Sequence, residues 1–196
     1  MQDRRHVPWR LTRYRLARIR RPVWRYAGKF TGDGTTPPPR PRWQAIVVAW
    51  LGALAALGGL GALAQFSHAP LVMAPFGASA VLLFAHPDST LTQPRNVIGG
   101  HCLGGLIGLL AGLGSGVLPD AGWLVMAVAV ATAIALMKLL RCVHPPAGAT
   151  TIVCLHLAPD WWVLVAPVLT GSVLLVVAAA IYNNAIEHRQ YPRHWW

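Results

Sequence analysis

Two short motifs of the same type, 71 residues apart, carry most of the chemistry that this sequence offers. The first is PFGAS at residues 75–79 and the second is PAGAT at residues 146–150, and apolar residues follow each. Proline suits the first position of a helix, glycine lets a ligand approach the backbone, and serine or threonine adds a hydroxyl. Short apolar segments that are broken by proline and glycine in matching halves of a chain indicate a transporter binding site.

The start of a helix inside a membrane favours negative charge, because its first N–H groups have no partner within the helix. If the two halves are inverted, one short helix starts from each side, and the two N-termini meet near the midplane. Such a pair of helix ends predicts an anion site. Lys138, Arg141 and His144 would stand at the inner approach and draw anions in. The alternative is that Pro145-Pro146 only kinks a helix and that the glycines pack it.

The candidate substrate-binding residues come from both motifs, from the basic approach and from one histidine of a long apolar stretch. They are Pro75, Gly77, Ala78, Ser79, His101, Lys138, Arg141, His144, Pro146, Gly148, Ala149 and Thr150. No Asp or Glu lies deep inside a long apolar stretch, so a cation pathway is not favoured. Protons would have to use His101, His144 or His156, although a lone histidine in an apolar span is typical of a hydrogen-bonded packing residue.

Catalytic and metal chemistry find little support in the sequence. There is no Ser–His–Asp set, no paired carboxylates and no phosphate loop. The cysteines and histidines between Cys142 and His156 lack the paired spacing of metal ligands. We therefore expect no enzyme, no metal and no cofactor, and we interpret Cys102, Cys142 and Cys154 as small buried hydrophobic residues.

The composition places most of the chain in a bilayer. Of 196 residues, 55% are hydrophobic and 12% are charged, and twelve of the seventeen Lys and Arg residues precede Trp43. Six apolar stretches follow, at roughly 43–66, 69–86, 96–118, 121–141, 143–157 and 161–182. The first, third, fourth and sixth are long enough to span, since about 20 helical residues cover the hydrocarbon core. Prolines shorten the helices of the other two.

We expect an all-α polytopic membrane protein of two three-helix repeats with inverted topology, each with one short broken half-helix. The alternative is four spans plus two re-entrant segments. The positive-inside rule favours six segments, because it puts loop 86–95, the Lys138–Arg141 end and the C-terminal tail on the side of the Arg-rich leader. It leaves only Asp120 and Asp160 in the outer loops. Both termini would then be cytoplasmic, in a bacterial inner membrane.

Three regions are expected along the chain. Residues 1–42 form a basic leader and a Gly/Pro-rich linker, either disordered or lying on the membrane surface. Residues 43–182 form the transmembrane domain, and residues 183–196 form a cytoplasmic tail. The net charge of +11 belongs to the leader rather than to a folded face, which argues against a nucleic-acid partner. Glycines of the first and third stretches allow close helix packing or a homo-oligomer contact.

The residues HPPAGAT at 144–150 resemble the signature of the HPP family of integral membrane proteins. APFGAS at 74–79 and QPRNVIGGH at 93–101 support the likeness, as do the preceding Lys138 and Arg141. The resemblance covers about residues 43–182 and leaves out the leader. It implies small-anion transport, since plastid and cyanobacterial members are linked to nitrite. The family is often described as having four spans, which differs from our topology.

The function expected from these features is membrane transport of a small monovalent anion, nitrite or nitrate, between two half-helix N-termini. The expected partners are that inorganic anion and the lipid bilayer, with anionic lipid at the basic leader, and a second copy of the chain through the glycine-rich helices. Two alternatives stay open. One is a membrane scaffold or sensor subunit whose motifs are structural, and the other is an intramembrane enzyme that uses Cys142 and His144.

Overall fold

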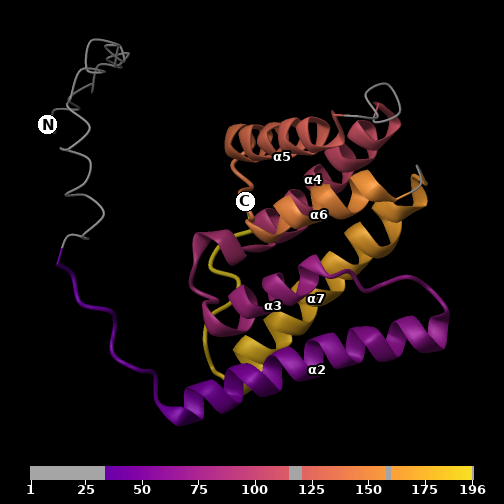
Figure 1. Cartoon of the computed structure of the whole chain (residues 1–196). Coiled ribbons are helices and arrows are strands. Elements are labelled where there is room, and N and C mark those ends of the chain that lie inside the picture. The colour runs from indigo at the N-terminus through magenta and orange to yellow at the C-terminus, as the bar shows by residue number, and fades with distance from the viewer. Residues whose placement is uncertain (1–33, 115–120, 158–159, 196) are drawn as a thin grey trace, which may run out of the picture. The chain divides into compact units, whose positions relative to one another are not determined.

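The structure of the chain is a computed structural model that describes residues 34–114, 121–157 and 160–195 (Figure 1). Two units are distinguished, Met1–Arg40 and Pro41–Trp196. Of the first unit, only residues 34–40 are described, and they contain no helix or strand. The expectations for residues 1–33 and for Asp120 therefore lie outside the described residues, and the three-region division stays a prediction.

The second unit is built from helices alone in its described residues. The α-helices are α2 (Trp43–Ser67), α3 (Pro75–Ala85), α4 (Pro94–Gly114), α5 (Gly122–Leu139), α6 (Pro146–His156) and α7 (Thr170–Ile181). A 3-10 turn, η2 (Thr90–Thr92), lies between α3 and α4, and π-helical turns at Leu164–Leu169 and Tyr182–Ile186 flank α7. The predicted all-α class is confirmed.

Four of these segments have the length and composition of membrane spans. They are Trp43–Ser67, Pro94–Gly114, Gly122–Leu139 and the continuous segment Leu164–Ile186. They coincide with the four apolar stretches from which spans were predicted. Large apolar side chains stand out from them, among them Phe66 at 82% and Leu139 at 74% exposed. Such exposure suits contact with lipid, where hydrocarbon takes the place of water.

The two short helices begin at the prolines that predicted them. Each has 11 residues, with Pro75 first in α3 and Pro146 first in α6. At this length a helix covers about 16 Å, roughly half of the hydrocarbon core. Non-helical chain precedes both, at residues 68–74 and 140–145. Each short segment is therefore a non-helical stretch followed by a half-length helix.

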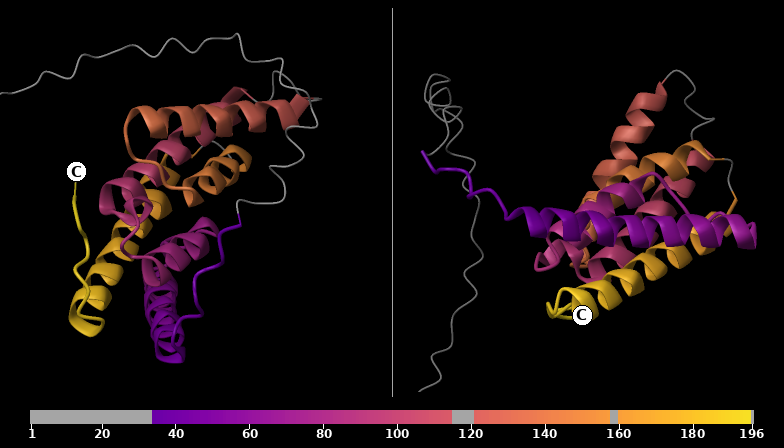
Figure 2. Two further views of the ribbon diagram at one scale, coloured as in Figure 1. Left: turned by 90° about the vertical axis from the view of Figure 1, so that its left-hand side faces the viewer. Right: turned by 90° about the horizontal axis from the view of Figure 1, so that it is seen from below.

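Successive helices alternate in direction, so that α2, α4 and α6 run one way and α3, α5 and α7 the other (Figures 1 and 2). Three contacts identify one end of the bundle. The Tyr182 hydroxyl donates to the Val48 carbonyl at 2.5 Å, and the Arg95 guanidinium donates to the Leu140 carbonyl at 2.6 Å. At the same end Arg193 pairs with Asp88.

These contacts put the start of α2, the α3–α4 loop, the end of α5 and the C-terminal tail together. Four spans with two re-entrant segments would separate the α3–α4 loop from the tail, so the arrangement favours six segments. The inverted relation of the two halves, and the side of the membrane that each end faces, stay predictions.

A stripe of glycines lets α4 lie directly against α6. Gly100, Gly104, Gly108 and Gly112 recur every four residues on one face of α4. A Cβ added at Gly104 would lie 2.5 Å from the Ala147 carbonyl oxygen, and one at Gly112 would lie 2.8 Å from that of Leu155. The expected close approach is thus present on α4. On α2 the close approach is present at Gly52, where an added Cβ would lie 2.6 Å from a ring carbon of Phe84. Gly58, Gly59 and Gly61 of the same helix face open space.

The last span contains an interruption that the sequence reading missed. Ala166 has non-helical dihedrals, φ −135° and ψ 115°, just before Pro167. Proline cannot donate to the preceding turn, so nearby carbonyls need other partners. The Thr170 hydroxyl donates to the Val165 carbonyl at 2.8 Å, and the Ser172 hydroxyl donates to that of Leu169 at 2.9 Å. Two hydroxyls thus supply hydrogen bonds to carbonyls beside the break.

Candidate functional site

Four of the predicted site residues form one buried hydrogen-bonded network. Ser79 comes from α3, His101 from α4, His144 from the turn before α6 and Thr150 from α6, and all four are fully buried. Ser79 Oγ lies 2.8 Å from His101 Nε2 and 2.8 Å from His144 Nε2. On the far side of the first ring, His101 Nδ1 lies 2.7 Å from Thr150 Oγ1.

The two repeated motifs converge on a single imidazole. Ser79 and Thr150 are the last residues of the two motifs, and they occupy opposite ring nitrogens of His101. Each residue lies one helical turn after its proline, on the side of its helix that faces α4. The matching chemistry of the motifs therefore has a structural counterpart at one place.

Neighbouring groups hold the two rings in position. His144 Nδ1 lies 2.8 Å from the Leu91 carbonyl oxygen in η2, and the Asn96 amide donates to the Val143 carbonyl at 2.8 Å. Phe76 packs edge-to-face on His101 with ring centroids 5.1 Å apart. Sequence reasoning left these positions out of the site. Asn96 could have been noticed, because it is a polar amide at the start of an apolar stretch. The role of a backbone carbonyl such as that of Leu91 cannot be predicted from the residue type.

The glycines of the motifs face away from this network. Gly77, Ala78 and Ala149 are exposed and Gly148 is half-buried. A Cβ added at Gly77 or Gly148 would meet no atom within 4 Å. Residues two positions apart on a helix point in nearly opposite directions. Because the fifth residue of each motif points toward the network, the third residue, the glycine, points away from it. These glycines are not packing positions, and they do not touch one another.

The N–H groups at the two helix starts are not free, in contrast to what the sequence led us to expect. The N–H groups of residues 76, 77, 147 and 148 donate to carbonyls three residues earlier, at 2.9 to 3.1 Å. The cause is local, because Ala74 and Pro145 already have helical dihedrals and tighten the chain into the helix. Polar side chains, rather than backbone donors, make up the site.

The three residues that were expected together at the inner approach to the site, Lys138, Arg141 and His144, lie in two different places. Lys138 and Arg141 are exposed, whereas His144 is buried in the network instead of standing beside them. The separation arises at Arg141, whose positive φ of 55° turns the chain inward after α5. Two cations thus stay at the end of the bundle where Arg95 also lies.

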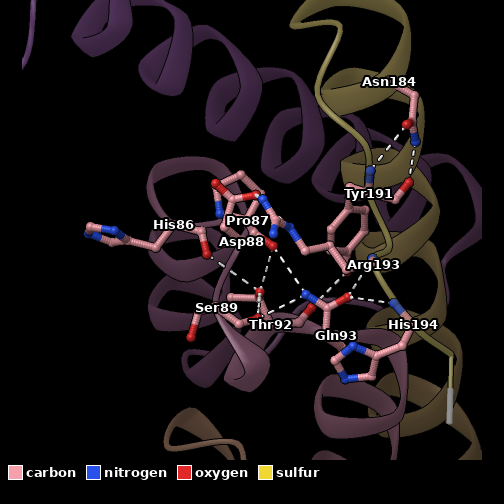
Figure 3. Close-up of polar contacts among 10 residues, drawn as sticks. All are labelled: His86, Pro87, Asp88, Ser89, Thr92, Gln93, Asn184, Tyr191, Arg193 and His194. Carbon is pink, nitrogen blue, oxygen red and sulfur yellow. Dashed lines mark hydrogen bonds and ion pairs between the residues drawn. The ribbon is translucent and has the colours of Figure 1, made fainter.

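The C-terminal tail, residues 187–195, packs against the loop of residues 86–93 between α3 and α4, which contains Leu91 (Figure 3). Tyr191 is 2% exposed, and its hydroxyl donates to the Thr92 carbonyl at 2.8 Å. Burial raises the pKa of the Tyr191 phenol, so this group stays protonated and remains a donor. Its backbone N–H donates to the Asn184 side-chain oxygen at 3.1 Å.

Two further contacts fasten the tail to the loop, as Figure 3 shows. The Gln93 amide donates to the Ser89 carbonyl at 2.9 Å, while its oxygen accepts the Arg193 backbone N–H at 2.9 Å. The Arg193 guanidinium donates two hydrogen bonds to Asp88, at 2.9 and 2.6 Å. The tail and η2 therefore support the carbonyl that orients His144.

Within the described ranges, no three His, Cys, Asp or Glu side chains are grouped as a metal site. In the same ranges, every buried side-chain nitrogen or oxygen has a hydrogen-bond partner. Cys142 and Cys154 are buried free cysteines, and Cys102 is partly buried. What the site offers is a set of neutral donors and acceptors shared among three helices.

The fold and the site define a multi-pass helical membrane protein with a polar network between two broken helices. Residues 38–192 match the family described as HPP, transmembrane region. The chain belongs to the HPP family.

Two proteins of Dictyostelium discoideum, each described as a transmembrane protein, are similar to the chain. One is 32% identical over 185 residues, which is 89% of this chain and 64% of the relative. The other is 35% identical over 129 residues, which is 64% of this chain and 42% of the relative. The chain thus spans less than two thirds of the length of either relative. No solved structure matches the chain.

Proposed function

We propose that this chain moves a small monovalent anion, nitrite or nitrate, across the membrane past the Ser79–His101–Thr150 network. The observation that carries the proposal is the convergence of Ser79 and Thr150, matching residues of the two motifs, on the two nitrogens of His101. Broken helices that meet at shared polar groups are the usual architecture of a transport site. The family resemblance makes nitrite the first substrate to test.

The chemistry of the surrounding elements fits an anion better than a cation. None of the helices α3, α4 and α6 contains an Asp or Glu. The donors of the network are hydroxyls and imidazole N–H groups, which bind anions without fixing their detailed chemistry. In the described structure these donors satisfy one another, so an anion would bind by taking over some of their hydrogen bonds.

The setting of this activity is part of the proposal. We place the chain in a bacterial inner membrane with both termini cytoplasmic, so that Arg95, Lys138 and Arg141 face the cytoplasm. The Arg-rich leader would lie on anionic lipid. Gly58 and Gly61, three positions apart on one side of α2 and facing open space, would suit contact with a second copy of the chain. We propose no enzymatic reaction and no cofactor.

The test is anion flux into vesicles that contain the purified protein. Nitrite, nitrate and chloride should compete with one another, because hydroxyl and imidazole donors select charge and size. Potassium and sodium should not cross. A cation flux equal to the nitrate flux, or no anion flux in vesicles that hold folded protein, would rule the proposal out.

One observation favours a second function, that of a membrane scaffold or sensor subunit. All buried polar side-chain atoms of the described residues are satisfied, which is what a purely structural polar core requires. The same flux assay decides between the two, since a scaffold would leave the vesicles impermeable to every anion tested.

A further inference from the structure

The tautomers of both buried histidines follow from one backbone carbonyl. The Leu91 oxygen can only accept, so His144 Nδ1, at 2.8 Å, carries the proton. Ring charge is unfavourable at a buried site without a carboxylate, so His144 is neutral and its Nε2 is an acceptor. The proton on that hydrogen bond must therefore come from the Ser79 hydroxyl, 2.8 Å away.

The same reasoning extends to the other end of the network. Ser79 has one proton and gives it to His144 at 2.8 Å rather than to the Pro75 carbonyl at 3.4 Å. Ser79 therefore accepts from His101, whose Nε2 carries the proton. A neutral His101 then has a bare Nδ1, which accepts from the Thr150 hydroxyl at 2.7 Å. All four donors point the same way, from Thr150 through His101 and Ser79 to His144 and the Leu91 carbonyl.

We propose that this chain of four side chains is a proton relay that couples a proton to each transported anion. The anion in this proposal rests on the proposed function. The directions of the hydrogen bonds do not, because they follow from the Leu91 carbonyl. Every link is 2.7 or 2.8 Å long, within the range over which protons transfer between oxygen and nitrogen.

The relay step balances in protons. A hydronium ion gives one proton to Thr150 Oγ1 and leaves as water. The original Thr150 proton moves to His101 Nδ1, the Nε2 proton of His101 moves to Ser79 Oγ, and the Ser79 proton moves to His144 Nε2. His144 ends as imidazolium, and the other three groups keep their proton count. The three hydrogen bonds between the four side chains have reversed, while His144 Nδ1 still donates to the Leu91 carbonyl. The new Thr150 proton is therefore free to bind an anion beside α6.

Release completes the passage. His144 gives its Nδ1 proton to water at the α3–α4 loop, and both imidazoles then hold the opposite tautomer. Each ring regains its starting tautomer when water takes the proton from one nitrogen and returns one to the other, and rotation of the two hydroxyls then restores the starting directions. The broken helices and the tail-held loop are the parts whose movement would admit that water.

The transient charge on His144 has no acidic partner nearby on α3, α4 or α6. The ionisable groups on the elements that pack against the relay are His86, Asp88, Arg95, Cys102, Lys138, Arg141, Cys142, Cys154, His156, Tyr182, Tyr191 and Arg193. Asp88, the single carboxylate among them, is paired with Arg193. The relay is therefore suited to pass a proton on rather than to store it.

The first experiment measures proton and anion movement in the same vesicles. Nitrate is the probe, because the neutral conjugate acid of nitrite crosses lipid unaided. With the wild-type protein, a nitrate gradient should acidify the interior together with nitrate uptake. Ser79→Ala should lower the proton-to-nitrate ratio about tenfold or more, because it breaks the chain in the middle. Ser79→Thr keeps a hydroxyl and should restore the ratio.

A matched control comes from the neighbouring threonine. Thr151 is equally buried on α6, and its hydroxyl donates to the Ala147 carbonyl outside the relay. Thr151→Val should leave the ratio unchanged. Nitrate uptake without protons in the wild type, or an unchanged ratio in Ser79→Ala, would overturn the relay while leaving anion transport in place.

The second experiment needs no transport. Nitrogen-15 NMR of histidine-labelled protein in lipid nanodiscs, assigned by comparison with His101→Gln and His144→Gln, should show an Nε2–H tautomer for His101 and an Nδ1–H tautomer for His144. The opposite tautomer at either ring would overturn the directions derived above. Absence of any nitrate flux with the expected tautomers would instead count against the proposed anion and its coupling.

Discussion

Gly148 and Gly104 are both helical glycines, yet their surroundings differ completely. A Cβ at Gly148 would meet nothing within 4 Å, whereas one at Gly104 would lie 2.5 Å from a backbone oxygen. Gly148→Val should therefore leave the folded yield near that of the wild type. If anions pass along the open face of α6, the same change should abolish nitrate flux. Folded yield and flux are to be measured on one purified sample.

Two control glycines separate folding from passage. Gly104→Val forces a side chain into the α4–α6 contact, an overpacking that costs about 1–3 kcal/mol or more, and should lower the folded yield. Gly59 of α2 also meets no atom within 4 Å, so Gly59→Val should change neither yield nor flux. Normal flux through folded Gly148→Val protein would mean that anions do not use this face.

At the residue scale, the sequence predicted the members of the site better than their roles. Matching hydroxyls in the two motifs, together with His101 and His144, were recognisable because polar groups are rare in apolar segments. The direction that each residue faces was not recognisable, since it depends on which side of the short helix meets α4. The expected backbone donors failed because the turn before each proline is already helical.

At the scale of the element, two contacts that hold the C-terminal tail differ in burial, and the more buried one should contribute more to its docking. Tyr191 is 2% exposed, while the Asp88–Arg193 side chains are about 60% exposed. Tyr191→Ala removes a buried ring, a loss of about 3–5 kcal/mol, and should release the tail. Trypsin should then cut after Arg189 and Arg193 much faster than in the wild type, as mass spectrometry of short digests would show.

Two milder substitutions in the contact between the tail and the loop should increase the cleavage rate less than Tyr191→Ala. Tyr191→Phe removes only the hydrogen bond to the Thr92 carbonyl, worth about 1 kcal/mol, and should accelerate cleavage about fivefold. Asp88→Asn weakens an exposed ion pair, worth at most about 1 kcal/mol, and should have no larger effect. Cleavage rates that follow the opposite order would contradict the docking of Tyr191.

The elements themselves were predictable where composition alone decides them. Four long apolar stretches gave four spans, and Pro75 and Pro146 marked the starts of α3 and α6, because proline fits only the first turn of a helix. The break at Pro167 was missed because this proline lies inside a continuous apolar stretch, whose length and composition already predicted one span. Nothing in the polar segment after α7 signalled that Tyr191 is buried.

At the scale of the whole molecule, charge in the loops is what relates the bundle to the membrane. Arg95, Lys138 and Arg141 lie at the bundle end that also holds the tail, as the contacts Arg95–Leu140 and Arg193–Asp88 show. Positive residues gather on the cytoplasmic side of membrane proteins, so this end should face the cytoplasm. The opposite end, where α4 and α6 end, should face outward, and we expect Asp120 and Asp160, which follow these helices in the sequence, on that side.

Single-cysteine labelling tests this arrangement with a reagent that does not cross the membrane. In a background without Cys102, Cys142 and Cys154, the variants Asp120→Cys and Asp160→Cys should both react in intact cells, and Asp88→Cys only after permeabilisation. Six segments place Asp120 and Asp160 on one side, because one out-and-back pair of segments, α5 and α6, separates them. Four spans with re-entrant segments place them on opposite sides, because only α5 then crosses between them. Opposite accessibility of these two positions would therefore refute the six-segment arrangement, whichever way the protein is oriented.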